Sequence, residues 1–230
     1  MKNLLIISTL TLTLSACAAG PNPRGPGLRP AANPSDVISA ELAFARLAQE
    51  KGQWTAFRQT AANDAVMFVP QRVRAQDWLK GRADPATAVK WQPSAVWSSC
   101  DGSYAVTQGQ WRSANSSGGF VTVWQRQGDP RRPTGYKWVL DMSVTTEHGT
   151  ASPDTIAAKV ADCRQVAVAR GVAVASSDGR VPDVKLESST DGSLSWTSEV
   201  RVDQSRHIVI ELWNGTRFDT VLELDGRDID

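Results

Sequence analysis

Hydrophobic and polar positions recur with two different periods along the chain, and the change of period separates helices from strands. Residues 36–51 carry apolar side chains at helical spacing, which predicts an amphipathic helix. The stripe consists of Ile38, Leu42 and Ala45, broadened by Val37, Phe44 and Ala48. Gly52 ends this helix. The elements predicted next are a helix at 53–62, a buried strand at 65–69 and a helical turn at 75–80.

From Val89 onward the period changes to two, which is typical of strands with one buried face. The predicted strands are 89–98, 103–112, 119–126 and 136–146. The dipeptide Asp101-Gly102 predicts a tight hairpin between the first two strands. Helices followed by an antiparallel sheet predict an α+β fold.

The order of these elements and several short motifs within them resemble the NTF2-like family (SnoaL-like, DUF4440-type). The residues that carry the resemblance are Glu41, Asp101-Gly102-Ser103-Tyr104, Gly109-Gln110-Trp111 and the runs 119–126 and 136–141. The resemblance covers residues 36–147. It implies a cone in which a curved antiparallel sheet wraps around a long helix and leaves a cavity open at one end. It also implies that two copies could pair through their sheets as a homodimer.

The rest of the chain lies outside this resemblance. Ser152-Pro153-Asp154 is a typical helix start, and it predicts a linking helix within 148–175 that carries Cys163 toward Cys100. Residues 176–230 are predicted to form a small antiparallel β-meander with one apolar face. Its predicted strands are 184–189, 193–202, 207–213 and 216–224. The predicted fold class is therefore α+β: an NTF2-like cone, a helix and a small β-meander.

The N-terminus has the pattern of a secretory signal over residues 1–16, with one lysine, an apolar run and then small residues. Leu14-Ser15-Ala16-Cys17 resembles the bacterial lipobox, which implies cleavage before Cys17 and lipidation of that residue. Residues 17–35 are rich in Pro and Gly and are expected to form a tether. We expect a lipid anchor in the cell envelope, facing the periplasm. Because Ala18 follows Cys17, we expect the outer membrane rather than the inner one.

Charge and cysteine content narrow the classes of partner. The chain carries 25 Lys and Arg against 24 Asp and Glu, so it lacks the basic excess of a nucleic-acid-binding protein. Besides Cys17 there are two cysteines, Cys100 and Cys163, and the periplasm is oxidising. We expect a disulfide that closes a loop worth about 4 kcal/mol in the chain-entropy model. The alternative is two separate buried thiols.

The chain contains nine tryptophans, which belong either to the core or to an aromatic-lined pocket. The predicted pocket residues are Phe68, Trp78, Trp97, Tyr104, Trp111, Trp124 and Asp141. Asp141 is the one catalytic candidate, because acidic residues are disfavoured in the middle of a strand. Strict alternation places it opposite Trp138 and Leu140, but does not decide whether it faces the cavity or solvent. His148 and His207 lie on different modules, so no metal or cofactor is predicted.

Three functions are compatible with these patterns. Few acid–base residues are present, which favours a non-catalytic envelope lipoprotein that binds a small apolar ligand or a protein partner. The second hypothesis is an assembly component that docks onto an envelope protein through the β-meander. The third is a small NTF2-like enzyme, of the isomerase, dehydratase or hydrolase type, that uses Asp141.

Overall fold

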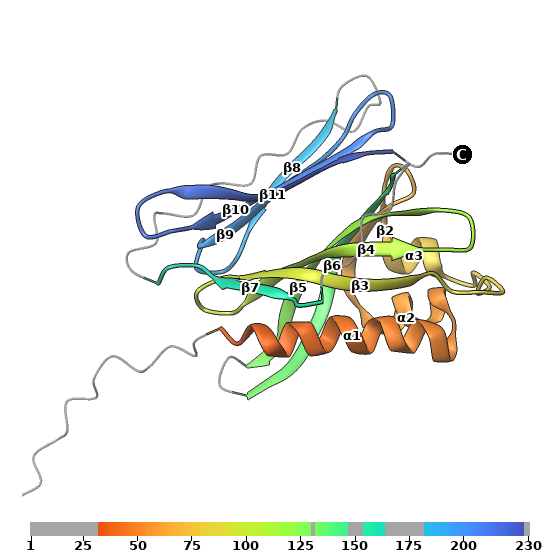
Figure 1. Ribbon diagram of the computed structural model, residues 1–230, viewed down its shortest axis with the longest axis horizontal. Coiled ribbons are helices and arrows are strands. Elements are labelled where there is room, and N and C mark those ends of the chain that lie inside the picture. Colours follow the sequence, from red (N-terminus) through yellow and green to blue (C-terminus); the bar gives the residue numbers. More distant parts are fainter. Residues whose placement is uncertain (1–31, 130–131, 147–153, 164–181, 228–230) are drawn as a thin grey trace, which may run out of the picture.

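The computed structural model describes residues 32–129, 132–146, 154–163 and 182–227 (Figure 1). Its helices are α1 (Pro34–Lys51), α2 (Gln53–Thr60) and α3 (Ala75–Leu79). Its strands are β1 (Ala61–Phe68), β2 (Arg72–Arg74), β3 (Lys90–Ser98), β4 (Tyr104–Arg112), β5 (Ser117–Asp129), β6 (Arg132–Thr146), β7 (Ala157–Val160), β8 (Asp183–Ser188), β9 (Leu194–Val200), β10 (Arg206–Trp213) and β11 (Phe218–Gly226). None of the helices among these residues has the length and apolar character needed to cross a membrane.

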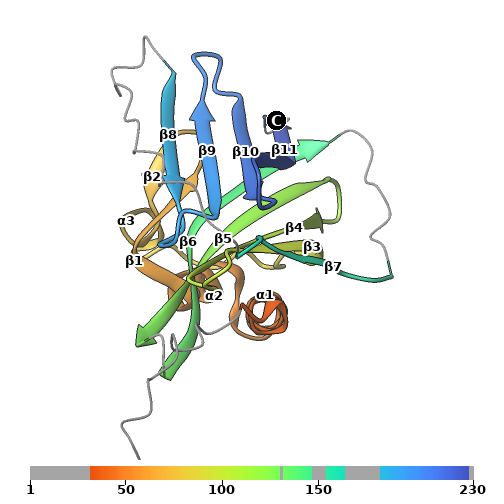
Figure 2. The same cartoon turned by 90° about the vertical axis from the view of Figure 1, so that its left-hand side faces the viewer.

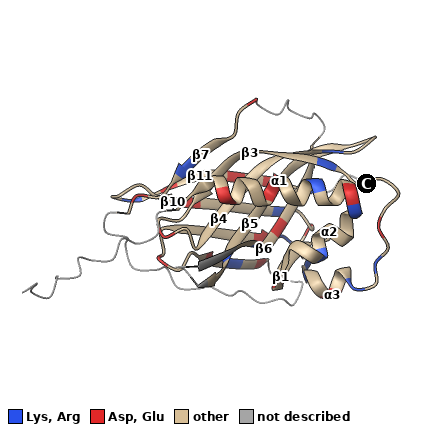
Figure 3. Ribbon diagram, turned by 90° about the horizontal axis from the view of Figure 1, so that it is seen from below, with Lys and Arg blue, Asp and Glu red and all other residues tan. Residues whose placement is uncertain are grey.

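The strands form two sheets that lie in separate layers. The first sheet has the order β2-β1-β6-β5-β4-β3-β7, with β1 parallel to β6 and β3 parallel to β7. The second sheet is antiparallel, in the order β11-β10-β9-β8. Helix α1 lies along one face of the first sheet, and the second sheet lies across the opposite face (Figure 1, Figure 2). Seen from the helix side, basic and acidic residues are interspersed (Figure 3).

Helix α1 begins where Asn33 caps it, with the Asn33 side chain accepting a hydrogen bond from the Ser35 amide at 3.2 Å. Of the predicted stripe, the residues that broadened it are buried against the sheet, and those at its centre are not among the buried residues. The buried residues of α1 are Val37, Glu41, Phe44 and Ala48. Leu42, which was predicted to be buried, is 40% exposed. A glutamate therefore occupies a core position, next to the leucine that the hydrophobic pattern predicted to be buried.

Gly52 separates α1 from α2 and has a φ of 104°, a conformation that side chains with a Cβ rarely adopt. A Cβ at this position would also lie 2.3 Å from the Asp84 side chain. The space left open lets Asp84 accept hydrogen bonds from the Thr55 amide (2.9 Å) and hydroxyl (2.6 Å). These bonds cap the start of α2 and hold the pKa of Asp84 below its usual range. The first residues of α2 are thereby fixed in place.

The predicted linking helix over 148–175 is wrong in the part that the structure describes. Residues 157–160 form strand β7, which pairs in parallel with β3, and Ala161 donates its amide to the Ser98 carbonyl at 2.9 Å. Ile156 and Val160 are β-branched, and such residues suit a strand. The free edge of β3 supplies the backbone partners that such a strand needs. Residues 148–153 and 164–175 lie outside the described residues.

The predicted disulfide between Cys100 and Cys163 is confirmed, with the two Cα atoms 5.2 Å apart. Cys100 follows β3, and Cys163 follows β7 by a few residues. A strand added to the sheet edge therefore brings the two cysteines together, where a helix had been expected to do so.

The predicted fold class is also wrong in its overall layout. Strands hold more than half of the described residues and helices less than a fifth, and the first sheet is mixed rather than antiparallel. The four C-terminal strands are a full layer rather than a small appended meander, because their apolar face is buried against the first sheet. The cluster between the sheets includes Val106, Val121, Val123, Leu140 and Met142 from the first and Leu194, Trp196, Ile208, Ile210 and Leu212 from the second.

The two sheets also meet through a pair of hairpin turns with the same pattern, Ser-Ser-X-Asp-Gly-Ser, at residues 98–103 and 188–193. In each turn the aspartate accepts hydrogen bonds from the two serines that flank it. Between the turns, the Cys100 amide donates to Ser193 Oγ (2.8 Å) and the Thr190 amide donates to Ser103 Oγ (3.1 Å). In each turn, the backbone amide of the residue before the aspartate therefore donates to the last serine of the other turn. This reciprocal pair of hydrogen bonds fixes the position of one sheet relative to the other.

Candidate active site

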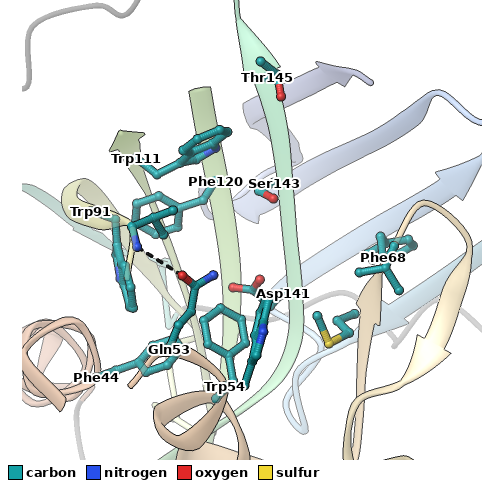
Figure 4. Close-up of a pocket in the computed structure, with 14 residues that line it drawn as sticks. Phe44, Gln53, Trp54, Phe68, Trp91, Trp111, Phe120, Asp141, Ser143 and Thr145 are labelled. Atoms are coloured by element: carbon teal, nitrogen blue, oxygen red, sulfur yellow. Dashed lines mark hydrogen bonds between the residues drawn. The ribbon is translucent and has the colours of Figure 1, made fainter. Parts of the chain in front are cut away.

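A cavity of about 310 Å³ lies between the first sheet and helices α1 and α2 (Figure 4). Most of its wall is aromatic or aliphatic, and its polar side chains come from α2 and from successive inward positions of β6. The lining residues are Phe44, Gln53, Trp54, Phe57, Met67, Phe68, Val69, Val89, Trp91, Trp111, Phe120, Asp141, Ser143 and Thr145. Such a composition suits a small, mainly apolar molecule that carries a few polar atoms.

A β-bulge in β6 turns Asp141 toward this cavity. Val123 pairs with Leu140 and Trp124 pairs with Trp138, so Val139 is left over as an extra residue. Strict alternation would place positions 138 and 141 on opposite faces of the sheet, but the extra residue puts both on the helix side. Leu140 packs against the second sheet instead. The question that alternation left open is thus answered: Asp141 faces the cavity.

The carboxyl of Asp141 has an environment that favours its neutral form. Burial is the main cause that raises its pKa to about 7, and the negative charge of Glu41 adds to the effect. Two groups act in the opposite direction. The Thr122 hydroxyl donates a hydrogen bond to Asp141 Oδ2 at 2.9 Å, and the positive charge of Arg206 favours the carboxylate. At neutral pH, Asp141 is therefore divided between its acid and its base forms.

Glu41 is a second carboxyl beneath the cavity floor, and it is fully buried. Its Oε1 accepts a hydrogen bond from the Trp91 indole at 2.7 Å. Its Oε2 accepts from the Thr107 hydroxyl at 2.6 Å and from the Trp124 indole at 3.1 Å. Burial raises the pKa of Glu41. Because Trp91 is part of the cavity wall, Glu41 acts on the site by holding this ring in place.

The aromatic part of the wall is a connected set of edge-to-face contacts. Phe44 packs against both Phe57 and Trp91 with ring centroids 4.8 Å apart, and Trp54 lies 5.5 Å from Phe57. Contacts of this geometry add about 0.5–1.5 kcal/mol per pair beyond the burial of area. The wall therefore has a defined shape without a ligand.

The predicted pocket residues divide into two groups. Phe68, Trp111 and Asp141 line the cavity. Trp124 lies beneath it, where its indole nitrogen is also 3.0 Å from Thr107 Oγ1.

The other predicted pocket residues lie away from the cavity lining. Trp78 packs against Trp54 with ring centroids 5.1 Å apart, and the Arg82 guanidinium lies 3.5 Å above its ring. Trp97 and Tyr104 pack in the cluster between the two sheets, because their strand positions point to that face. Tyr104 lies beside Trp196, with a centroid distance of 5.3 Å.

Sequence reasoning missed several lining residues on the helices and on β3. Trp54 and Phe57 are three residues apart and lie on one face of α2, a spacing that indicates a common apolar surface. The sequence pattern did not indicate which part of the molecule that surface faces. Gln53 gave no signal at all, since a glutamine at a helix start is ordinary. Trp91 could have been found only by knowing that its strand runs beneath α1.

Histidine plays no part in the cavity as described. His207 lies on β10 in the second sheet, with its ring nitrogens 2.9 Å from Glu223 and 3.7 Å from Glu199. His148 lies outside the described residues. Among the described residues, no group of three His, Cys, Asp or Glu side chains is arranged to hold a metal ion.

No protein-family model and no curated protein matches the chain. Three solved structures resemble part of its fold. A provisionally assigned ketosteroid isomerase from Parabacteroides distasonis is 14% identical, with a TM-score of 0.39 over 51% of this chain and 96% of that one. A second, from Kribbella flavida, is 12% identical, with a TM-score of 0.35 over 53% and 86%. An LEH-like epoxide hydrolase from M. tuberculosis is 15% identical, with a TM-score of 0.30 over 49% and 84%.

These neighbours have the NTF2-like fold. Identities and TM-scores this low say nothing about chemistry. What the cavity does must be argued from its own residues.

Proposed function

We propose that the protein is a small NTF2-like enzyme that binds a mainly apolar substrate in the cavity and uses Asp141 as a general base and acid. One observation carries the proposal: a carboxyl with a pKa of about 7 projects into an aromatic-lined cavity. A catalytic group transfers protons best when its pKa is near the working pH. The unperturbed carboxyl of an aspartate, with a pKa near 4, would be a much weaker base.

The reaction that fits one such carboxyl is proton transfer at carbon, of the isomerase type. In the first step the Asp141 carboxylate takes a proton from a carbon next to a carbonyl group. The C–H bond breaks, an O–H bond forms on Asp141, and the electron pair moves through the C–C bond onto the carbonyl oxygen. Return of the proton to the same or another carbon restores the carboxylate and closes the cycle.

The two other hypotheses have less support. Non-catalytic binding of an apolar ligand requires the same cavity but gives no reason for a carboxyl with a neutral pKa inside it. Docking through the β-meander requires an accessible apolar face on the second sheet. Because that face is buried against the first sheet, we do not propose docking through it.

The test uses 2-acetonaphthone, a bicyclic ketone with exchangeable protons next to its carbonyl. The purified protein is incubated with this ketone in deuterated water, and incorporation of deuterium into its methyl group is followed by NMR. We expect exchange above the buffer rate, increasing with pH through about 7 as Asp141 loses its proton. Asp141→Asn should lower the rate by about 100-fold or more.

Thr122→Val is the matched variant for this experiment, because it removes only the hydroxyl that donates to Asp141. Loss of that bond disfavours the carboxylate, so the pH midpoint of exchange should move upward while exchange itself persists. The proposal is contradicted if equilibrium dialysis shows the ketone bound while exchange remains at the buffer rate. It is also contradicted if Asp141→Asn exchanges as fast as the wild type.

The location of this activity is a separate proposal, because residues 1–31 lie outside the described residues. We propose a lipid anchor at Cys17 in the bacterial envelope, supported by the lipobox-like run that ends at this residue. Mass spectrometry of the protein isolated from membranes should give an acylated N-terminal Cys17. An N-terminal peptide that begins at Met1 would contradict the anchor.

A further inference from the structure

Gln53 lines the cavity, and its side chain carries hydrogen-bond donors that no group of the described residues engages. It is the first residue of α2 and is only 9% exposed. The Val89 amide donates to Gln53 Oε1 at 3.0 Å, which settles which end of the side-chain amide is oxygen. The nitrogen, Nε2, is left directed into the cavity on the side where the Asp141 carboxyl lies (Figure 4). Within the described part of the chain it has no hydrogen-bond partner.

Because Nε2 is open to the cavity, a ligand that covers it must offer an acceptor there, and a hydrocarbon that covers it leaves the donor without a partner. The ligand atom that meets this need is an oxygen with free lone pairs. A carbonyl oxygen supplies the acceptor and brings no donor of its own that would need a further partner. The cavity thus has a donor on the helix wall and a base on the sheet wall.

We propose that Gln53 Nε2 binds the carbonyl oxygen of the substrate while Asp141 acts on the neighbouring carbon. This assignment rests on the proposed function and deepens it. It assigns the group that binds the carbonyl oxygen which the proposed reaction requires, and it makes Gln53 a second catalytic residue. As the proton leaves carbon, negative charge develops on the carbonyl oxygen, and a donor already aimed at that oxygen stabilises it.

The surroundings of Gln53 hold its amide in one orientation. Asp84 fixes the first turn of α2 through Thr55. The Val89 peptide is held from both sides, since Gln49 Nε2 donates to its carbonyl at 2.8 Å while its amide donates to Gln53. A donor that is oriented before the reaction begins needs no reorganisation when charge develops.

Gln49 also provides a matched control, because it holds the same peptide as Gln53 but is exposed and lies outside the cavity lining. The experiment compares Gln53→Met with Gln49→Met. Equilibrium dialysis measures the dissociation constants of two probes of similar shape, 2-acetonaphthone and 2-ethylnaphthalene, which differ in the carbonyl group.

We expect Gln53→Met to weaken binding of the ketone by about tenfold and to change binding of the hydrocarbon by less than about twofold. The rate of deuterium exchange should fall by a larger factor than the affinity for the ketone. The reason is that the hydrogen bond from Gln53 Nε2 to the carbonyl oxygen strengthens as negative charge develops there. Gln49→Met removes a bond to the Val89 peptide but no donor from the cavity, so it should reduce the preference for the ketone much less than Gln53→Met does. Gln53→Glu retains an acceptor for the Val89 amide and loses the donor, so it should lose the ketone preference as well.

The assignment of Gln53 is overturned if the wild type shows no preference for the ketone, or if Gln53→Met and Gln53→Glu keep that preference. Its failure is distinguishable from that of the proposed function. If both Gln53 variants exchange normally while Asp141→Asn does not, the role of Gln53 is wrong and that of Asp141 stands. If the ketone preference depends on Gln53 but the wild type catalyses no exchange, Gln53 recognises the carbonyl and the proposed catalysis fails.

Discussion

The carboxyl groups of Glu41 and Asp141 both lie close to the aromatic wall of the cavity, but their surroundings differ. Glu41 has every side-chain oxygen engaged by a neutral donor and lies out of reach of any ligand. Asp141 has one oxygen bound by Thr122 and projects into the cavity. The first orders the wall through Trp91, and the second is available for chemistry.

The raised pKa of Asp141 predicts how stability depends on pH. Between about pH 3.8 and 7 the folded protein keeps a proton on Asp141 that the unfolded chain has lost. The free energy of unfolding should therefore fall as pH rises through this window, by up to about 1.4 kcal/mol per unit. Asp141→Asn removes this contribution, whereas Glu41, whose pKa is raised by its own burial, is present in both proteins. Urea unfolding at several pH values measures the difference, and parallel profiles for the two proteins would refute the assignment.

At this scale the sequence singled out Asp141, which lines the cavity, but did not decide which face of the sheet it occupies. The signal was an acidic residue in the middle of a strand. Its face depends on the extra residue at Val139, and a bulge leaves no mark in a pattern of alternating side chains. Glu41 was visible as part of a family resemblance, but its burial contradicts the hydrophobic stripe around it.

At the scale of elements, the paired turns between the sheets are the feature most open to test. Ser193 is fully buried and accepts from the Cys100 amide, so Ser193→Ala leaves a buried donor without its acceptor. We expect a loss of about 1–3 kcal/mol. Ser103→Ala should cost less, because its partner Thr190 is exposed.

The control for these variants is Ser116→Ala, in the exposed turn between β4 and β5. Its hydrogen bonds are local, so the free energy of unfolding measured in urea should stay within about 0.5 kcal/mol of the wild type. Equal effects of Ser193→Ala and Ser116→Ala would show that the paired turns do not join the layers.

Most elements could be predicted because their periods were long and clear, as for α1 and β3 to β6. The linking helix failed for a physical reason. Ile156 and Val160 are four positions apart, a spacing that places both on one face of a helix or on one face of a strand. The open edge of β3 decides in favour of the strand. Pairing with a distant edge is not encoded in the local pattern.

At the scale of the whole molecule, the disulfide joins the last strand of the first sheet to its neighbour across 63 residues. Replacing both Cys100 and Cys163 by Ala should lower stability by about 2–4 kcal/mol, since the unfolded chain regains the freedom of that loop. Thermal unfolding with and without reductant measures the effect. Reductant should destabilise the wild type and leave the variant unchanged, and a variant as stable as the oxidised wild type would contradict this account.

The layered arrangement is the part of the fold that the sequence described least well. An apolar face on the C-terminal strands was predicted, but a pattern of side chains does not say which surface covers it. The shared Ser-Ser-X-Asp-Gly-Ser run at 98–103 and 188–193 is visible in the sequence, and its meaning depends on the contact between the two turns. The same limit applied to Gln53, which belongs to the site only because α2 lies against the sheet.

The central claim is that a carboxyl of near-neutral pKa faces an aromatic cavity, and its most direct test is the titration of Asp141 itself. The side-chain carboxyl carbon of aspartate is labelled with ¹³C, and the signal of Asp141 is assigned by its absence from Asp141→Asn. We expect its chemical shift to titrate with a midpoint near pH 7. A midpoint near pH 4, the ordinary value for an exposed aspartate, would contradict the account.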